Sequence, residues 1–124
     1  MARILVVEDV EETRESLQTT LQSLGHITHA AHDGLDAEDY LEGGQYDLVI
    51  TDIMMPFRNG FDVIRMAKAK HDKSKFLAIS GGGPLISASF STSLAQIKGH
   101  RSLKKPFTRQ QFIGAVNDLL LEPA

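Results

Sequence analysis

Short uninterrupted runs of apolar residues recur along the chain and predict strands that are buried on both faces. The clearest run occupies residues 4–7 (ILVV), and similar runs occupy residues 48–50 (LVI) and 76–79 (FLAI). Runs of this length, without alternating polar residues, are typical of the inner strands of a parallel sheet. Weaker patterns at residues 27–31 and 101–104 predict two further strands.

The segments that follow these strands carry apolar residues at helical spacing and predict five helices. Gly25 is a natural stop for the first helix, and Gly43 with Gly44 ends the second. Thr108 and Gln111 fit a capping box at the start of the last helix. The apolar positions are Leu17, Leu21 and Leu24; Ala37, Tyr40 and Leu41; Phe61, Ile64 and Ala67; Ile86, Phe90, Leu94 and Ile97; and Phe112, Val116, Leu119 and Leu120.

Strands and helices therefore alternate five times, which predicts an α/β fold. Strand–helix–strand units have right-handed crossovers and form a parallel sheet with helices on both faces. We expect an open, doubly wound sheet of five strands flanked by five helices. The chain has 124 residues and no internal repeat, which favours a single domain over residues 1–124.

Composition and charge narrow the class of protein. Hydrophobic residues make up 42% and charged residues 23% of the chain, as in a folded domain rather than a disordered one. The absence of cysteine excludes a disulfide scaffold, a thiolate zinc site and a cysteine nucleophile. The net charge of −3 argues against direct binding of nucleic acid by a surface spread over the whole domain.

Neither a secretion signal nor a membrane-inserting segment is evident. The first nine residues contain Arg3, Glu8 and Asp9 around only four consecutive apolar residues, unlike a signal peptide. The longest stretch without charge, residues 76–97, is broken by three glycines and Pro84 and is rich in hydroxyl side chains. We therefore expect a cytoplasmic protein without membrane insertion.

Polar residues stand at the expected carboxyl ends of the strands, where open α/β sheets place their functional crevice. Glu8 and Asp9 follow the first strand, Asp52 the third, Ser80 the fourth and Lys105 the fifth. If these ends meet, three carboxylates and a lysine surround one small pocket. The carboxylates repel one another unless a cation joins them, and hard oxygen ligands suit Mg²⁺. The pattern favours a metal-assisted phosphoryl-transfer site over a general acid–base pair.

Four motifs together resemble the receiver domain of two-component response regulators. They are Val7-Glu8-Asp9, residues 49–56 (VITDIMMP) with Gly60, Ser80-Gly81-Gly82 and Lys105-Pro106-Phe107. Each motif alone is unspecific, but their joint spacing covers nearly the whole chain. The resemblance implies a flavodoxin-like sheet with strand order 2-1-3-4-5. It also implies a stand-alone receiver similar to chemotaxis regulators, which is a phosphorylation-activated signalling switch.

The resemblance further implies roles for the acidic residues. Asp52 would accept a phosphoryl group from a histidine kinase or a histidine phosphotransfer protein. Glu8 and Asp9 would hold Mg²⁺ together with Asp52 and the backbone carbonyl of Met54.

The remaining site residues would act on the phosphoryl group. Ser80 would contact its oxygens, and Lys105 would pair with the phosphoaspartate, with a cis peptide bond before Pro106. The domain would not be an enzyme for a separate substrate. It would catalyse its own phosphorylation and a slow dephosphorylation, because Met54 and Gly82 cannot position an attacking water through side-chain hydrogen bonds.

The output of the switch departs from the family pattern at one position. Many receivers carry an aromatic residue three positions before the family lysine, where this chain has Ser102. We therefore expect the helix predicted at residues 84–97 to carry the signal itself. A separate downstream protein would bind the face formed by residues 84–121.

Three alternatives to a phosphorylated receiver fit the sequence less well. A haloacid-dehalogenase-type enzyme also uses a strand-end aspartate with Mg²⁺, but it needs a second aspartate two residues later, where this chain has Met54. A degenerate receiver that binds without phosphate is disfavoured because all the site residues are present. A glycosidase-type carboxylate pair would need a sugar cleft that a domain of this size is too small to build.

Overall fold

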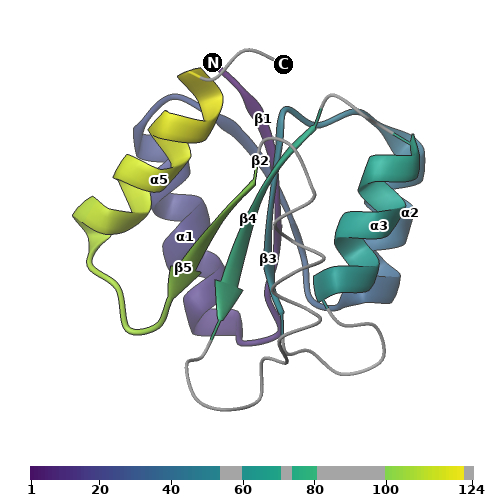
Figure 1. The fold of residues 1–124 in the computed structure, drawn as a ribbon, viewed down its shortest axis with the longest axis horizontal. Helices are drawn as coiled ribbons and strands as arrows, with labels where there is room; N and C mark the ends of the chain where they lie inside the picture. Colours follow the sequence, from purple (N-terminus) through teal and green to yellow (C-terminus); the bar gives the residue numbers. More distant parts are fainter. Residues whose placement is uncertain (54–59, 71–73, 81–99, 122–124) are drawn as a thin grey trace.

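Five strands form one parallel sheet in the order β2-β1-β3-β4-β5, which confirms the predicted topology. The computed structural model describes residues 1–53, 60–70, 74–80 and 100–121. Each strand pairs in parallel with its neighbours, so all carboxyl ends lie at one edge of the sheet (Figure 1). The strands are β1 (Arg3–Val7), β2 (Ile27–Ala31), β3 (Leu48–Asp52), β4 (Lys75–Ser80) and β5 (His100–Lys104).

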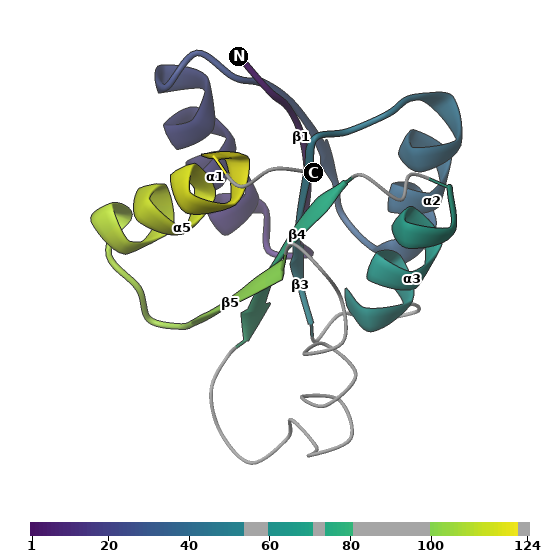
Figure 2. The ribbon, with the colours of Figure 1, turned by 45° about the horizontal axis from the view of Figure 1, so that its top comes forward.

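Two helices cover each face of the sheet in the described residues. α1 (Glu11–Ser23) and α5 (Arg109–Leu121) lie on one face, and α2 (Gly34–Gly43) and α3 (Gly60–Lys70) lie on the other (Figures 1 and 2). The helix predicted at residues 84–97 falls outside the described residues. None of the helices in the described ranges is long and apolar enough to cross a membrane.

The core consists of two apolar layers separated by the sheet. Alternate residues of β1 point to opposite faces, so Ile4 and Val6 pack with α1 and α5, whereas Leu5 and Val7 pack with α2 and α3. The side chains of β1, β3 and β4 are almost all inaccessible to solvent. Burial of a Leu or Phe side chain contributes roughly 1.5–3 kcal/mol. The packing of these apolar side chains therefore fixes the positions of β1, β3 and β4, and with them the carboxyl ends of these strands.

Two predicted helix ends are confirmed in atomic detail. After α1, Gly25 adopts a positive φ of 89°. The Gly25 amide donates to the Gln22 carbonyl and the His26 amide to the Leu21 carbonyl, which is a Schellman motif. Before α5, the Thr108 amide donates to Gln111 Oε1, and the Gln111 amide donates to Thr108 Oγ1. This reciprocal pair is the predicted capping box.

A buried lysine connects β4 to the end of α5. The Lys75 ammonium donates a hydrogen bond of 2.7 Å to the carbonyl oxygen of Leu119. Leu119 lies in the last turn of α5, where carbonyls lack intrahelical partners, and this turn contains no basic residue of its own. The ammonium of Lys75, on β4, therefore lies at the C-terminal end of α5, where the helix dipole is negative.

Replacing this ammonium is expected to destabilise the domain. Lys75→Met leaves the Leu119 carbonyl without its buried donor, and we expect a loss of about 2–3 kcal/mol in the free energy of unfolding. Urea unfolding followed by circular dichroism measures this loss. Lys104→Met, at an exposed lysine of β5, is the matched control and should change the free energy by less than about 0.5 kcal/mol. Equal effects of the two variants would contradict the capping role of Lys75.

Candidate functional site

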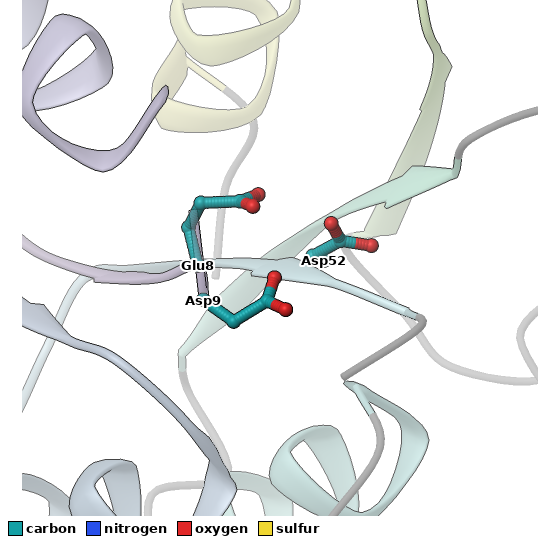
Figure 3. A group of neighbouring side chains, drawn as sticks. All are labelled: Glu8, Asp9 and Asp52. Carbon is teal, nitrogen blue, oxygen red and sulfur yellow. The ribbon is translucent and has the colours of Figure 1, made fainter. Parts of the chain in front are cut away.

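Three carboxylates converge at the carboxyl edge of the sheet. Glu8 and Asp9 directly follow β1, and Asp52 is the last residue of β3, the neighbour of β1. One carboxylate oxygen from each of the three lies within 4.8 Å of the others. Figure 3 shows the side chains of Glu8 and Asp9 extending from one segment toward the side on which Asp52 lies. The predicted acidic cluster therefore forms.

Glu8 is the most buried member of the cluster, with no exposed surface. Its Oε1 accepts a hydrogen bond of 3.2 Å from the Val10 amide. Its Oε2 is buried without a hydrogen-bond partner among the described residues. Burial raises the pKa of Glu8 to about 7, and the negative charge of Asp52 acts in the same direction.

Lys105 provides the positive charge of the site. Its ammonium lies 3.0 Å from Asp52 Oδ2, to which it donates a hydrogen bond, and 3.5 Å from Glu8 Oε2. Burial by itself lowers the pKa of this lysine, but the hydrogen bond and charge of Asp52, with the charge of Glu8, raise the pKa above its ordinary value. The ammonium therefore stays charged near neutral pH.

The backbone around Lys105 is tied to the end of β4. The Lys105 amide donates a hydrogen bond of 2.7 Å to the Ser80 carbonyl, and the Lys105–Pro106 peptide bond is cis, as predicted. Ser80 is buried at the end of β4. The structure thus places Ser80 at the same sheet edge as the acidic cluster.

The donor set suits a divalent cation with a preference for oxygen ligands. With the three acids ionised, the Lys105 ammonium balances one of their three negative charges. Glu8 Oε2 lies 3.5 Å from this ammonium and accepts no hydrogen bond within the described residues. Mg²⁺ is commonly held by one or two carboxylates and water. The residues present therefore fit Mg²⁺.

Met54 and Ser102 are two further residues that the sequence analysis singled out. Met54, whose carbonyl was predicted as a metal ligand, lies outside the described residues. Ser102, which replaces the family aromatic, is exposed on β5.

The structure adds two α1 residues that the sequence pattern did not single out. The Arg14 guanidinium donates a hydrogen bond of 3.0 Å to the Glu8 carbonyl oxygen. Thr13 lines an open pocket of about 460 Å³ together with Lys105, Pro106 and Phe107. Neither contact follows from strand periodicity, because Arg14 binds a backbone carbonyl of the preceding loop and Thr13 lies beside a loop about ninety residues further along the chain.

The comparison with protein families agrees with this geometry. The family model for the response regulator receiver domain matches residues 4–117. The chain belongs to this family. As a receiver domain, it is a phosphorylation-activated signalling module of a two-component system.

Individual relatives support the family assignment. The chain is 31% identical over 121 residues to the sensor kinase CckA of Brucella abortus, covering 96% of this chain and 12% of that protein. It spans about half the length of two curated relatives, the regulatory protein CusR of Escherichia coli and the response regulator MprA of Mycobacterium avium. A receiver protein structure from Sinorhizobium medicae is 29% identical, with a TM-score of 0.83 and coverage of 95% and 93% of the two chains.

One similar structure was determined with a bound ion. The response regulator TrrA of Thermotoga maritima, in complex with Mg²⁺-BeF, is 29% identical to this chain. The two chains are covered to 96% and 99%, with a TM-score of 0.78. The similarity therefore extends along the whole receiver domain.

The charge of Glu8 is expected to cost stability when no metal is present. Because its pKa is about 7 in the folded chain against 4.5 ordinarily, its contribution to stability falls as the pH rises through this window. Glu8→Gln keeps an acceptor for the Val10 amide and removes the charge. At pH 8 in EDTA, we expect the variant to have a free energy of unfolding about 1–3 kcal/mol above the original chain. This advantage should vanish below about pH 4.5.

Urea unfolding at several pH values measures this difference, and Glu15→Gln, at an exposed glutamate of α1, is the control. Adding Mg²⁺ should stabilise the original chain more than Glu8→Gln, because the variant has lost a charged ligand. A Glu8→Gln variant that is less stable at pH 8 in EDTA would contradict the raised pKa.

Proposed function

We propose that Asp52 accepts a phosphoryl group from a histidine kinase or histidine phosphotransfer protein. The observation that carries this proposal is the arrangement around Asp52. Its carboxylate lies beside two other acids and accepts a hydrogen bond from the Lys105 ammonium, at the strand edge of a receiver domain. A carboxylate near a lysine and a divalent cation is a competent nucleophile toward phosphorus at neutral pH.

Mg²⁺ is the proposed cofactor. Glu8, Asp9 and Asp52 would hold it, with the Met54 carbonyl as a further ligand; the proposal is supported by the acidic cluster and by the Mg²⁺-BeF complex of TrrA. When bound, the ion supplies positive charge to the oxygens of the transferred group. Burial and the charge of Asp52 both raise the pKa of Glu8, and a bound cation would oppose this shift.

The transfer itself is a displacement at phosphorus. A carboxylate oxygen of Asp52 bonds to phosphorus while the bond from phosphorus to the donor's imidazole nitrogen breaks, and the imidazole keeps that electron pair. The Lys105 ammonium, 3.0 Å from Asp52 Oδ2 before transfer, remains available to pair with the phosphoryl oxygens afterwards. Ser80 is proposed to contact these oxygens through its hydroxyl group.

Phosphorylation would change a surface that binds a separate protein. Ser80 ends β4, and Lys105 lies between β5 and α5, so both residues connect the site to the face of residues 84–121. The described part of this face comprises β5 and α5. A receiver of this kind is a switch in the cytoplasm that catalyses its own phosphorylation and slow dephosphorylation.

Removal of the acceptor carboxylate should abolish phosphorylation. Treatment of the original chain with acetyl phosphate and Mg²⁺ should add one phosphoryl group in intact mass spectrometry. Asp52→Asn should gain none, because an amide is not a nucleophile toward phosphorus under these conditions. Asp39→Asn, at an exposed aspartate of α2, is the matched control and should behave like the original chain. A phosphorylated Asp52→Asn variant would refute the assignment.

The phosphorylated chain should keep its phosphoryl group for minutes or longer without a phosphatase. Met54 has no side-chain group that can orient an attacking water by hydrogen bonding. Met54→Asn introduces such a group and should accelerate the loss severalfold, whereas Met54→Leu should not. The decay is measured by intact mass after acetyl phosphate is removed. A half-life of seconds in the original chain would contradict this expectation.

A further inference from the structure

Arg14 joins α1 to the loop that carries two of the acids. Its Nη1 donates a hydrogen bond of 3.0 Å to the carbonyl oxygen of Glu8. This carbonyl lies one residue beyond the end of β1, where the sheet ladder ends. A buried backbone carbonyl requires a donor, and the guanidinium of a half-buried helical residue supplies it.

The same residue also fixes the loop through its backbone. The Arg14 amide donates to the Val10 carbonyl at 2.9 Å and closes the first turn of α1. The Val10 amide in turn donates to Glu8 Oε1, and the Glu8 amide donates to the Ala31 carbonyl in β2. Arg14 therefore holds the loop between Glu8 and Val10 at two points, one through its side chain and one through its main chain.

Charge alone does not account for an arginine at this place. The first turn of a helix favours negative charge, as Glu11 and Glu12 of α1 illustrate, and a cation there is mildly unfavourable. A cation beside a metal site also repels Mg²⁺. The favourable contact that the structure shows for the Arg14 guanidinium is its hydrogen bond to the Glu8 carbonyl oxygen.

We propose that Arg14 is a positioning residue for the cation site. By fixing the Glu8–Asp9 peptide, its guanidinium directs both carboxylates toward Asp52. This inference rests on the proposed function, because it assigns Mg²⁺ to the acidic cluster. It adds a contact from α1 that lies outside the set of ligands.

The proposal predicts an effect opposite in sign to simple electrostatics. Removal of a nearby positive charge should strengthen Mg²⁺ binding if Arg14 acts only through its charge. Loss of the contact that orients the ligands should weaken binding, and such supporting contacts commonly contribute 10–100-fold to metal affinity. The direction of the change in affinity therefore separates the two explanations.

The test is a calorimetric titration of the full chain with Mg²⁺ alone. We expect Arg14→Met to weaken Mg²⁺ binding about tenfold and Arg14→Lys, which keeps the charge and one donor, to recover part of this loss. In NMR spectra, the Mg²⁺-induced shifts of the Glu8 and Asp9 amides should shrink in Arg14→Met. Arg65→Met is the matched control, since Arg65 lies on α3, is largely exposed and pairs with Asp62 at 3.8 Å. It should leave the affinity unchanged.

The other outcomes are decisive as well. If the original chain binds Mg²⁺ and Arg14→Met binds it equally well or more tightly, the positioning role is overturned while the proposed function stands. If the original chain itself does not bind Mg²⁺, the proposed function fails, and this inference fails with it. Should Arg14→Met be unfolded by circular dichroism, Arg14→Gln replaces it. The expected order of affinity is then the original chain, Arg14→Lys and Arg14→Gln, and a variant that binds more tightly than the original chain refutes the proposal.

Discussion

Electrostatic repulsion among three carboxylates at one edge of the sheet is the constraint on which the site depends. Glu8, Asp9 and Asp52 approach within 4.8 Å, and the Lys105 ammonium balances only one of their charges. The pKa of Glu8 rises to about 7 because its carboxylate is buried next to Asp52. In the metal-free chain, unfavourable charge is therefore concentrated at the place where we propose that a cation and a phosphoryl group bind.

The rest of the fold keeps these charges together. The interiors of β1, β3 and β4 are apolar on both faces, so the strands cannot shift without exposing large side chains. Beyond the strand ends, polar contacts take over: the Val10 amide and the Arg14 guanidinium bind Glu8, and the Ser80 carbonyl binds the amide of Lys105. The stability of the apolar core thus compensates for the unfavourable charge at this edge of the sheet.

The fold was predictable because its signals are local and repeated. Each inner strand appears in the sequence as a run of apolar residues. The end of α1 at Gly25 and the start of α5 at Thr108 depend on backbone hydrogen bonds within a few residues. The acidic cluster was predictable because parallel strands end at the same edge. Lys75 and Arg14 were not, since lysine and arginine are ordinarily exposed and their partners, the carbonyls of Leu119 and Glu8, carry no side-chain signal in the sequence.

The most direct test of the account is a crystal structure of the chain grown with Mn²⁺ and beryllofluoride. Mn²⁺ gives an anomalous signal and accepts the oxygen ligands that Mg²⁺ uses, and beryllofluoride stands for the phosphoryl group. The account predicts one Mn²⁺ among Glu8, Asp9 and Asp52, with beryllium bonded to a carboxylate oxygen of Asp52 and fluorine within reach of the Lys105 ammonium. Beryllofluoride on another residue, or Mn²⁺ absent from this edge at saturating concentration, would contradict it.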